Sequence, residues 1–318
     1  MAERLSLEQT AALLKTKDDI GILLHRFPDG DTIGSGTALC RALRKLGKRA
    51  KLICSDPIPA KYEYLDAGEM QEFEPSWYCA VDVATLHLLG SGFEQYDGQI
   101  GLCIDHHGTN SAYADNLLLD ADCAACAMIV TRLIPLLGVE LDVEMAEALY
   151  TGISTDTGCF RYSNVTADTF RMAADLWERG ARTAMINQLM FETKSRARIE
   201  LERMALDGIE YRCDDRVAIL TITQEMIRKS GAGDDDLEGL TPLSRQIEGV
   251  WVGLTLRQKI DGSFKVSVRT GTHADASAIC AVLGGGGHTR ASGCEPKGDR
   301  DAVVEQLIAA IKQTVPRI

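Results

Sequence analysis

Short apolar runs alternate with helix-like segments through the first half of this 318-residue chain, and this alternation limits the possible folds more than any other feature. Runs of four to seven apolar residues bounded by turn residues are typical of strands. Strands that alternate with helices predict a parallel or mostly parallel sheet with helices on both faces, which is an α/β fold. The predicted strands are Ile20–Leu24, Arg49–Cys54, Trp77–Val83, Gln99–Ile104 and Asn116–Leu119.

The pattern changes in the last third of the chain and predicts a second, smaller α+β domain. Gly249–Gln258 and Phe264–Thr270 form a predicted hairpin, and a helix is expected at Asp275–Leu283. Charged residues at helical spacing precede this region and predict a helix that joins the two domains. We expect a catalytic domain at 1–190, a linker helix at 191–210 and a substrate-binding domain at 211–318.

Composition excludes some classes of function. The net charge of −12 and the pI near 5.0 argue against tight binding of long duplex nucleic acid, which needs many basic contacts to phosphates. No apolar run approaches the roughly 20 residues that span a bilayer, and the N-terminus lacks a secretory pattern. The ten cysteines are scattered among apolar neighbours, which is typical of reduced thiols. We therefore expect a cytoplasmic protein without a membrane partner.

Carboxylates and imidazoles gather where four segments of the first half end. In open α/β sheets, ligands bind at the carboxyl ends of the strands, so these groups are expected to converge. Pro28 and Gly30 favour a sharp turn after the first strand, and Gly34 and Gly36 lie in the helix that follows. The four groups of residues are His25 with Asp29 and Asp31, then Asp82, then Asp105-His106-His107, and finally Asp156.

Each of these groups is weak by itself. Asp31 alone is most simply a helix cap and His25 a surface residue, and an isolated Asp82 at a strand end usually makes a turn. The run Asp105-His106-His107 is more informative, because histidine is the commonest metal ligand. A carboxylate at the end of a helix, such as Asp156, is disfavoured by the helix dipole unless a cation compensates it.

Taken together, the four groups predict a centre for two divalent metal ions. Two imidazoles and at least four carboxylates suit Mn²⁺ best, with Mg²⁺ as the alternative, and no cysteines have the spacing of a structural zinc site. Many carboxylates in one place repel each other, and two cations relieve this better than one. Two metals roughly 3.5–4 Å apart can hold a bridging hydroxide and clamp a phosphoryl oxygen. The sequence therefore predicts phosphoester hydrolysis.

In order and approximate spacing, the same groups resemble the four motifs of the DHH phosphoesterases. The resemblance implies that Asp82 bridges the two metals, that Asp105 orients the imidazoles, and that His107 contacts the substrate phosphate and assists protonation of the leaving oxygen. Leu88 stands where some relatives carry a basic residue. The implied ligands are His25, Asp29 and Asp82 for one metal, and Asp31, Asp82, His106 and Asp156 for the other.

A run of four glycines, Gly284–Gly287, precedes His288. A helix C-cap needs only one glycine, so four indicate close approach of another group to the backbone, and no Gly-Lys-Ser/Thr follows as in a P-loop. The run is similar to the GGGH signature of the C-terminal domain associated with DHH proteins. The resemblance implies that the nucleotide part of the substrate is bound, across an interdomain cleft, by Arg269, Gly285, Gly286, Gly287 and His288. Arg290 is either a further substrate contact or a solvated surface residue.

The expected activity follows from the resemblance. A chain of this length without added domains is similar to the nano-RNase type, which cleaves very short RNA and removes the phosphate from 3′-phosphoadenosine 5′-phosphate. The partners would be short single-stranded RNA or nucleotides, and a homodimer is possible. Two alternatives remain open: a phosphodiesterase for cyclic dinucleotides or their linear products, and a catalytically inactive nucleotide sensor.

Overall fold

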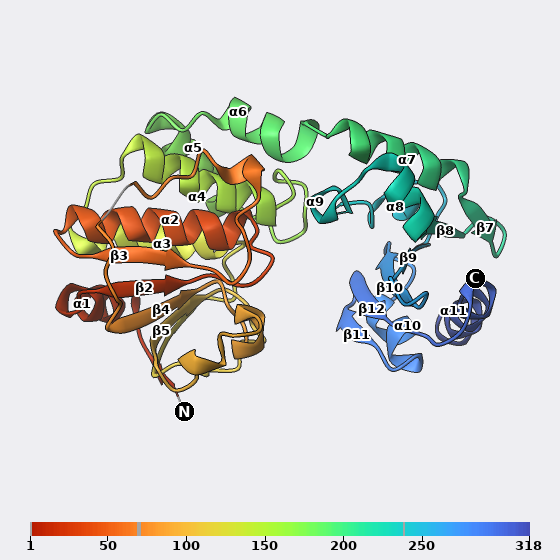
Figure 1. Ribbon diagram of the computed structural model, residues 1–318, viewed down its shortest axis with the longest axis horizontal. Helices are drawn as coiled ribbons and strands as arrows, with labels where there is room; N and C mark the ends of the chain where they lie inside the picture. Colours follow the sequence, from red (N-terminus) through yellow and green to blue (C-terminus); the bar gives the residue numbers. More distant parts are fainter. Residues whose placement is uncertain (1, 69–70, 238) are drawn as a thin grey trace. The chain divides into compact units, whose positions relative to one another are not determined.

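The protein divides into two compact units, residues 1–193 and 194–318 (Figure 1). This computed structural model describes residues 2–68, 71–237 and 239–318. Helix α7 (Arg196–Asp207) lies in the segment expected to link the domains, but it packs against α8 (Gln224–Ser230) and β8 (Val217–Ile222) and is part of the second unit. Within the described residues, no helix combines the length and apolar character that crossing a bilayer would require.

The first unit is built on a six-stranded sheet with the order β1-β6-β5-β4-β2-β3, and all its strand pairs are parallel. This confirms the predicted α/β fold. The short edge strand β1 was not predicted from the sequence. The strands are β1 Glu3–Arg4, β2 Ile20–Leu23, β3 Ala50–Ile53, β4 Trp77–Val81, β5 Ile100–Asp105 and β6 Asn116–Leu119.

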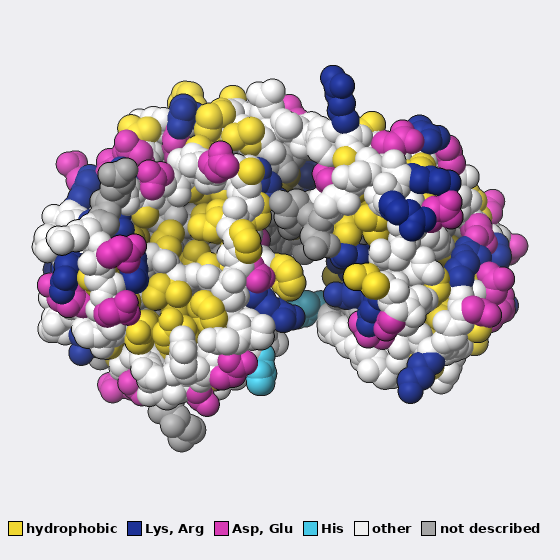
Figure 2. Space-filling view, in the orientation of Figure 1, with side chains coloured by type: hydrophobic (Ala, Val, Ile, Leu, Met, Phe, Trp, Pro, Cys, Tyr) yellow, Lys and Arg dark blue, Asp and Glu magenta, His cyan; other side chains and the backbone are white. Residues whose placement is uncertain are grey.

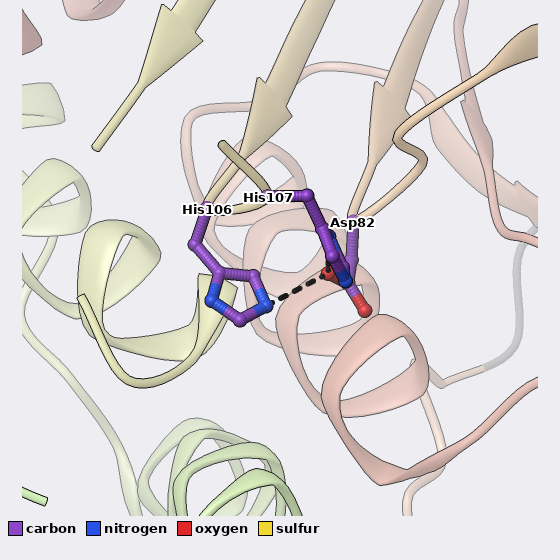
Figure 3. Close-up of side chains that lie close together, drawn as sticks. All are labelled: Asp82, His106 and His107. Atoms are coloured by element: carbon purple, nitrogen blue, oxygen red, sulfur yellow. Dashed lines mark ion pairs between the residues drawn. The ribbon is translucent and has the colours of Figure 1, made fainter. Parts of the chain in front are cut away.

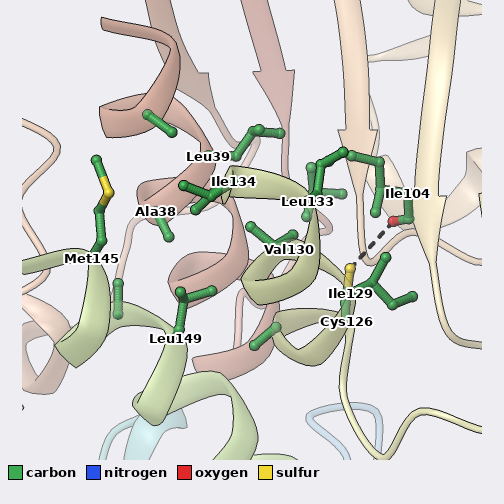
Figure 4. Packing of buried hydrophobic residues seen from close by; sticks show 14 of the residues in the cluster. Ala38, Leu39, Ile104, Cys126, Ile129, Val130, Leu133, Ile134, Met145 and Leu149 are labelled. Atoms are coloured by element: carbon green, nitrogen blue, oxygen red, sulfur yellow. Dashed lines mark hydrogen bonds between the residues drawn. The ribbon is translucent and has the colours of Figure 1, made fainter. Parts of the chain in front are cut away.

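Alternate residues of the central strands separate the two faces of this sheet. On one face, the four helices α1–α4 bury a core that includes Ile104 of β5, Leu39, Val130 and Leu149 (Figure 4). The other face buries a smaller cluster around Cys103, covered by short 3₁₀ helices. The helices are α1 Leu7–Thr16, α2 Gly30–Lys45, α3 Cys126–Leu137, α4 Val143–Asp156, α5 Ala167–Glu178 and α6 Thr183–Asn187, with 3₁₀ helices η1 Ala60–Tyr62, η2 Leu86–Leu89 and η3 Glu94–Tyr96 and a π-helix η4 Gln188–Glu192.

Glycines bring α2 and α4 into close contact. A Cβ atom on Gly34 would lie 2.2 Å from the carbonyl oxygen of Ala148, and one on Gly152 would lie 2.7 Å from Oδ1 of Asp31. Real Cβ atoms do not approach other atoms so closely, so only glycine permits this packing. The close contact places the carboxyl end of α4 beside the start of α2.

The second unit contains a mixed six-stranded sheet with the order β11-β12-β10-β9-β8-β7, in which only the β8–β9 pair of the described strands is parallel. Helices α10 and α11 cover one face and α7–α9 the other, as expected for an α+β domain. The glycine run enters a short strand that was not predicted. The remaining elements are β7 Glu210–Arg212, β9 Val252–Gln258, β10 Phe264–Thr270, β11 Gly286–His288, β12 Ala291–Cys294, α9 Asp234–Leu237, η5 Leu243–Arg245, α10 Ala276–Val282 and α11 Arg300–Thr314.

Candidate metal centre

The three central strands β2, β4 and β5 deliver their terminal residues to one edge of the first sheet. They are neighbours and run parallel, so their carboxyl ends lie side by side. His25 follows β2, Asp82 follows β4, and His106 follows β5. Asp156, the last residue of α4, reaches the same place from the helical layer. The side chains that the sequence predicted to converge are therefore brought together.

Asp82 belongs to two of the three sets of potential metal ligands in this part of the chain. One oxygen, Oδ2, is 3.7 Å from Nε2 of His25, and the other, Oδ1, is 3.5 Å from Nε2 of His106 (Figure 3). The ligand atoms within each set lie no more than 4.8 Å apart, as they would around a cation. The three sets are His25, Asp29 and Asp82; Asp31, His106 and Asp156; and Asp82, His106 and His107.

The backbone of Asp82 adopts φ +60°, in the left-handed region that non-glycine residues seldom occupy. This conformation costs roughly 1–2 kcal/mol and is stored most often at functional sites. The N–H of Asp82 donates to the carbonyl of Ile104 at 2.9 Å, so the turn stays attached to β5. The strained turn directs the carboxylate to the edge of the sheet.

Backbone carbonyls fix the orientation of two imidazoles. Nδ1 of His25 is 2.8 Å from the carbonyl oxygen of Arg26, and Nδ1 of His106 is 3.1 Å from that of Cys123. A protonated Nδ1 donates these bonds and leaves Nε2 with a free lone pair. Nε2 of His106 is 3.2 Å from Asp156 and 3.8 Å from Asp31. Such partners behind a metal-binding imidazole set both its tautomer and its direction.

Two carboxylates of the first loop also cap helices. Asp29, rather than Asp31, is the N-cap of α2 and accepts from the backbone N–H groups of Asp31 and Thr32. Asp31 is completely buried and accepts from the first N–H groups of α3, those of Cys126 at 2.6 Å and Ala127 at 2.8 Å. Capping holds both carboxylates in place and favours their charged form.

Asp105 is buried behind the two histidines. It accepts from Nδ1 of His107 at 2.8 Å and from the Asn110 side chain at 2.6 Å. Burial opposes ionisation, yet these hydrogen bonds hold the pKa of Asp105 below its ordinary value. The carboxylate therefore stays charged and orients the more exposed His107 ring. Asn110 was not singled out in the sequence, since a lone asparagine after a histidine run gives no signal.

The pKa shifts of the cluster show an excess of negative charge that would suit a bound cation. Burial and the neighbouring carboxylate Asp31 raise the pKa of Asp82 well above its ordinary value. Burial and the charge of Asp156 raise the pKa of Asp31 to about 7. For His106, burial lowers the pKa, but the hydrogen bond to Asp156 outweighs burial and the pKa rises to about 9. Among the described residues, Oδ1 of Asp82 and Nε2 of His106 are buried without a hydrogen-bond partner. Oxygen and imidazole ligands with unsatisfied lone pairs fit divalent cations such as Mn²⁺ or Mg²⁺.

The residues predicted to bind substrate lie in the second unit. Arg269 of β10 and His288 of β11 are both paired in register with Ala291 of β12, so their side chains project from the same face of the sheet. Gly285 packs against the carbonyl of Gly293, where a Cβ atom would lie 2.2 Å away. Gly287 adopts φ +142°. At least these two glycines are therefore required by the backbone itself.

Arg290 has a local structural role. Its Nη1 donates to the carbonyl oxygen of Ala274 at 3.0 Å and to that of Gly271. These bonds join the loop after β10 to the turn between β11 and β12. The sequence left Arg290 as either a substrate contact or a solvated surface residue, and neither role includes this contact between loops. The roles of the metal-ligand and substrate-binding residues stay predictions.

Comparisons with known proteins agree with the geometry. The model of the DHH family, N-terminal domain, matches residues 19–153. A bifunctional oligoribonuclease and PAP phosphatase NrnA from Thermus thermophilus is 34% identical over 94% of this chain and 90% of the relative. The chain belongs to the DHH family. A second NrnA, from Bacillus subtilis, is 25% identical to this DHH protein over 86% of the chain and 88% of the relative.

Solved structures share the fold. An exopolyphosphatase-related protein from Bacteroides fragilis is 24% identical, with a TM-score of 0.88 over 98% of this DHH protein and 96% of that chain. RecJ of Thermus thermophilus, solved in complex with Mn²⁺, is 16% identical, with a TM-score of 0.60 over 98% of this chain and 55% of RecJ. These likenesses support the fold described above.

Proposed function

We propose that this DHH protein hydrolyses phosphoester bonds in short oligoribonucleotides and removes the phosphate from 3′-phosphoadenosine 5′-phosphate with the help of two divalent metal ions, Mn²⁺ in preference to Mg²⁺. The observation that carries the proposal is the position of Asp82, whose two oxygens face different sets of ligand atoms. The NrnA relatives, which match nearly the whole chain, are named for both activities.

In this proposal, different residues bind the metal ions and donate the proton. His25, Asp29 and Asp82 would hold one ion, and Asp31, His106 and Asp156 would hold the other together with Asp82, whose Oδ1 lies 3.5 Å from Nε2 of His106. When bound, the ions supply positive charge that activates water and neutralises phosphoryl oxygens. The buried Asp105 binds Nδ1 of His107, which leaves Nε2 of this partly exposed ring as the atom that can donate a proton to the leaving oxygen.

The second unit binds the nucleotide part of the substrate in this proposal. Arg269 supplies a guanidinium for a phosphate, and His288 and the backbone of Gly285, Gly286 and Gly287 supply further donors. A substrate with few phosphates fits the net charge of −12 and the interspersed acidic and basic side chains on the surface in Figure 2. Long duplex nucleic acid is therefore not a substrate.

We further propose a cellular compartment and an oligomeric state for the protein. Its ten free cysteines, most of them buried, fit a reducing cytoplasm. A homodimer is proposed from the exposed residues Ile199 and Leu206 of α7, which are large apolar side chains on one helix.

A substrate panel tests the proposed activity. The purified protein, with Mn²⁺ and with a chelator, is assayed on a diribonucleotide, 3′-phosphoadenosine 5′-phosphate, cyclic di-AMP and a long RNA duplex. We expect Mn²⁺-dependent hydrolysis of the first two substrates and much slower turnover of the others. Preferential hydrolysis of cyclic di-AMP, or nucleotide binding without any hydrolysis, would overturn the proposal.

A further inference from the structure

Phe27 is an exposed aromatic residue beside the metal centre. It lies in the loop between β2 and α2, two residues from His25 and two from Asp29. Its side chain is 72% exposed, whereas the neighbouring Pro28 is buried. Single exposed apolar residues are common on protein surfaces, so exposure alone carries no conclusion. The way in which this residue is held distinguishes it.

The backbone of Phe27 is in an unfavourable conformation and is firmly fixed. Its φ is +51°, which is rare for an aromatic residue. The N–H of Phe27 donates to Oδ2 of Asp56 at 2.9 Å, and the N–H of Arg26 donates to the carbonyl of Leu88 at 2.6 Å. These bonds anchor the loop to the segments that follow β3 and β4. The ring therefore projects from a rigid support at a fixed place.

The same peptide group holds a metal ligand. The carbonyl of Arg26, in the peptide bond to Phe27, is the partner of Nδ1 of His25. The left-handed turn at Phe27 thus sets both the direction of the imidazole and the direction of the phenyl ring. A substrate whose phosphate lies at His25 has its adjoining groups within reach of the ring, because only one residue separates the two.

A cation accompanies the ring. The guanidinium carbon of the exposed Arg26 lies 5.2 Å from the centre of the Phe27 ring. Nucleobases stack on aromatic side chains, and nearby arginines attract the phosphates that connect them. A base-free phosphoester offers nothing for a phenyl ring to bind. An aromatic and a basic side chain at this place therefore match a substrate that carries a base next to its reactive phosphate.

We propose that Phe27 is a specificity-determining residue that stacks on the nucleobase adjoining the scissile phosphate, with Arg26 beside it. The inference rests on the proposed function and extends it. It states that the first unit, as well as the glycine-rich second unit, recognises the base and discriminates nucleotides from base-free phosphoesters.

The experiment compares two substrates that differ only in the base. Values of kcat/KM are measured with 3′-phosphoadenosine 5′-phosphate and with the ribose bisphosphate that lacks adenine. Phe27→Asn removes the ring but tolerates a left-handed backbone, and Phe27→Tyr keeps a ring. The substrate ratio is kcat/KM for 3′-phosphoadenosine 5′-phosphate divided by kcat/KM for the ribose bisphosphate. We expect Phe27→Asn to lower this ratio about tenfold, which corresponds to about 1.4 kcal/mol, and Phe27→Tyr to keep it near the wild-type value.

Trp177→Ala is the matched control, since it also removes an exposed aromatic ring from the first unit. Gly180, close to Trp177, packs against Val143 at the first turn of α4. This end of the 14-residue helix is about 20 Å from Asp156. The substrate ratio of Trp177→Ala should equal that of the wild type.

Two outcomes overturn the inference. An unchanged ratio in Phe27→Asn, whether or not both rates fall, shows that the residue only supports His25. Failure of the proposed function is distinct, because the wild type would then hydrolyse neither substrate. If the wild type hydrolyses neither substrate, stacking is tested by the binding of a 2-aminopurine nucleotide in the presence of Mn²⁺, measured by the fluorescence of the nucleotide. Weaker binding and less quenching in Phe27→Asn support stacking, and wild-type affinity in that variant overturns it.

Discussion

The two units differ in how far their candidate site residues are exposed to solvent. The first unit buries three carboxylates almost completely, those of Asp31, Asp82 and Asp105. The second unit exposes Gly286, Gly287 and His288. The buried carboxylates are each held by other residues, such as the N–H groups of α3 for Asp31 and Asn110 for Asp105. Burial strengthens electrostatic interactions and fixes geometry, which suits the activation of water by metal ions. An exposed surface costs less to desolvate and admits substrates of varied length. In this protein, the residues expected to act on the phosphate are buried and those expected to bind the nucleotide are exposed.

The largest expected effect is in the buried region. Asp82→Asn removes the charge between the two sets of ligands and should lower kcat by about 10³-fold or more. The fold should persist, because an amide resembles the neutral carboxyl that burial favours here. Steady-state kinetics and Mn²⁺ stoichiometry measure the effect. A kcat near that of the wild type would refute the bridging role.

The support behind the ligands should matter less than the ligands themselves. Asn110→Ala removes the 2.6 Å hydrogen bond to Asp105 and should reduce metal affinity or kcat by about 10- to 100-fold. Asn116→Ala is the control, since it removes a side-chain hydrogen bond, to the carbonyl of Gly101, from an asparagine at the start of β6. The side chain of Asn110 also donates to the carbonyl of Val83. Equal losses of metal affinity and kcat in both variants would mean that Asn110 contributes only to the stability of the fold.

The exposed region should respond in KM. Arg269→Ala and His288→Ala remove donors for the substrate and should each raise KM about tenfold, with a smaller fall in kcat. Kinetics with a diribonucleotide over a range of concentrations separate the two constants. An unchanged KM in both variants would contradict the assignment of substrate binding to the second unit.

The buried cluster should also make stability depend on pH. The pKa values of Asp31 and His106 are raised to about 7 and about 9, so between about pH 4 and 9 the metal-free folded state binds more protons than the unfolded state. The free energy of unfolding should therefore fall as the pH rises through this range. Saturating Mn²⁺ displaces these protons and should reverse the trend. Thermal unfolding with chelator and with Mn²⁺ tests this, and a flat metal-free profile would contradict it.

The smallest effect is expected at Arg290. Arg290→Lys weakens the bonds to the carbonyls of Gly271 and Ala274 and should destabilise the second unit by about 1 kcal/mol. Its change in KM should be smaller than that of Arg269→Ala. Denaturant unfolding and kinetics are measured on the same preparation. A larger effect on KM than on stability would make Arg290 a substrate contact.

Local patterns were sufficient for the strands β2 to β6 of the first unit but not for its edge strand β1. Strands such as β5 and β6 were predicted because buried parallel strands are continuous apolar runs. The two-residue strand β1 has no such run and exists only through pairing with β6. Similarly, β11 consists of two glycines and a histidine, whose strand conformation depends on β12. Pairing between distant segments overrides local propensity in both cases.

The candidate ligands of the metal centre could be selected from the sequence, because carboxylates and imidazoles placed at the ends of apolar runs meet at the edge of a parallel sheet. The contacts that hold each side chain depend on the folded structure. It assigned the cap of α2 to Asp29, placed Asp31 on the N-terminus of α3, and turned the peptide after Arg26 toward His25. The contact of Asp31 with Ala127 joins residues 96 positions apart, and local sequence does not indicate it because close packing, not propensity, selects the partner.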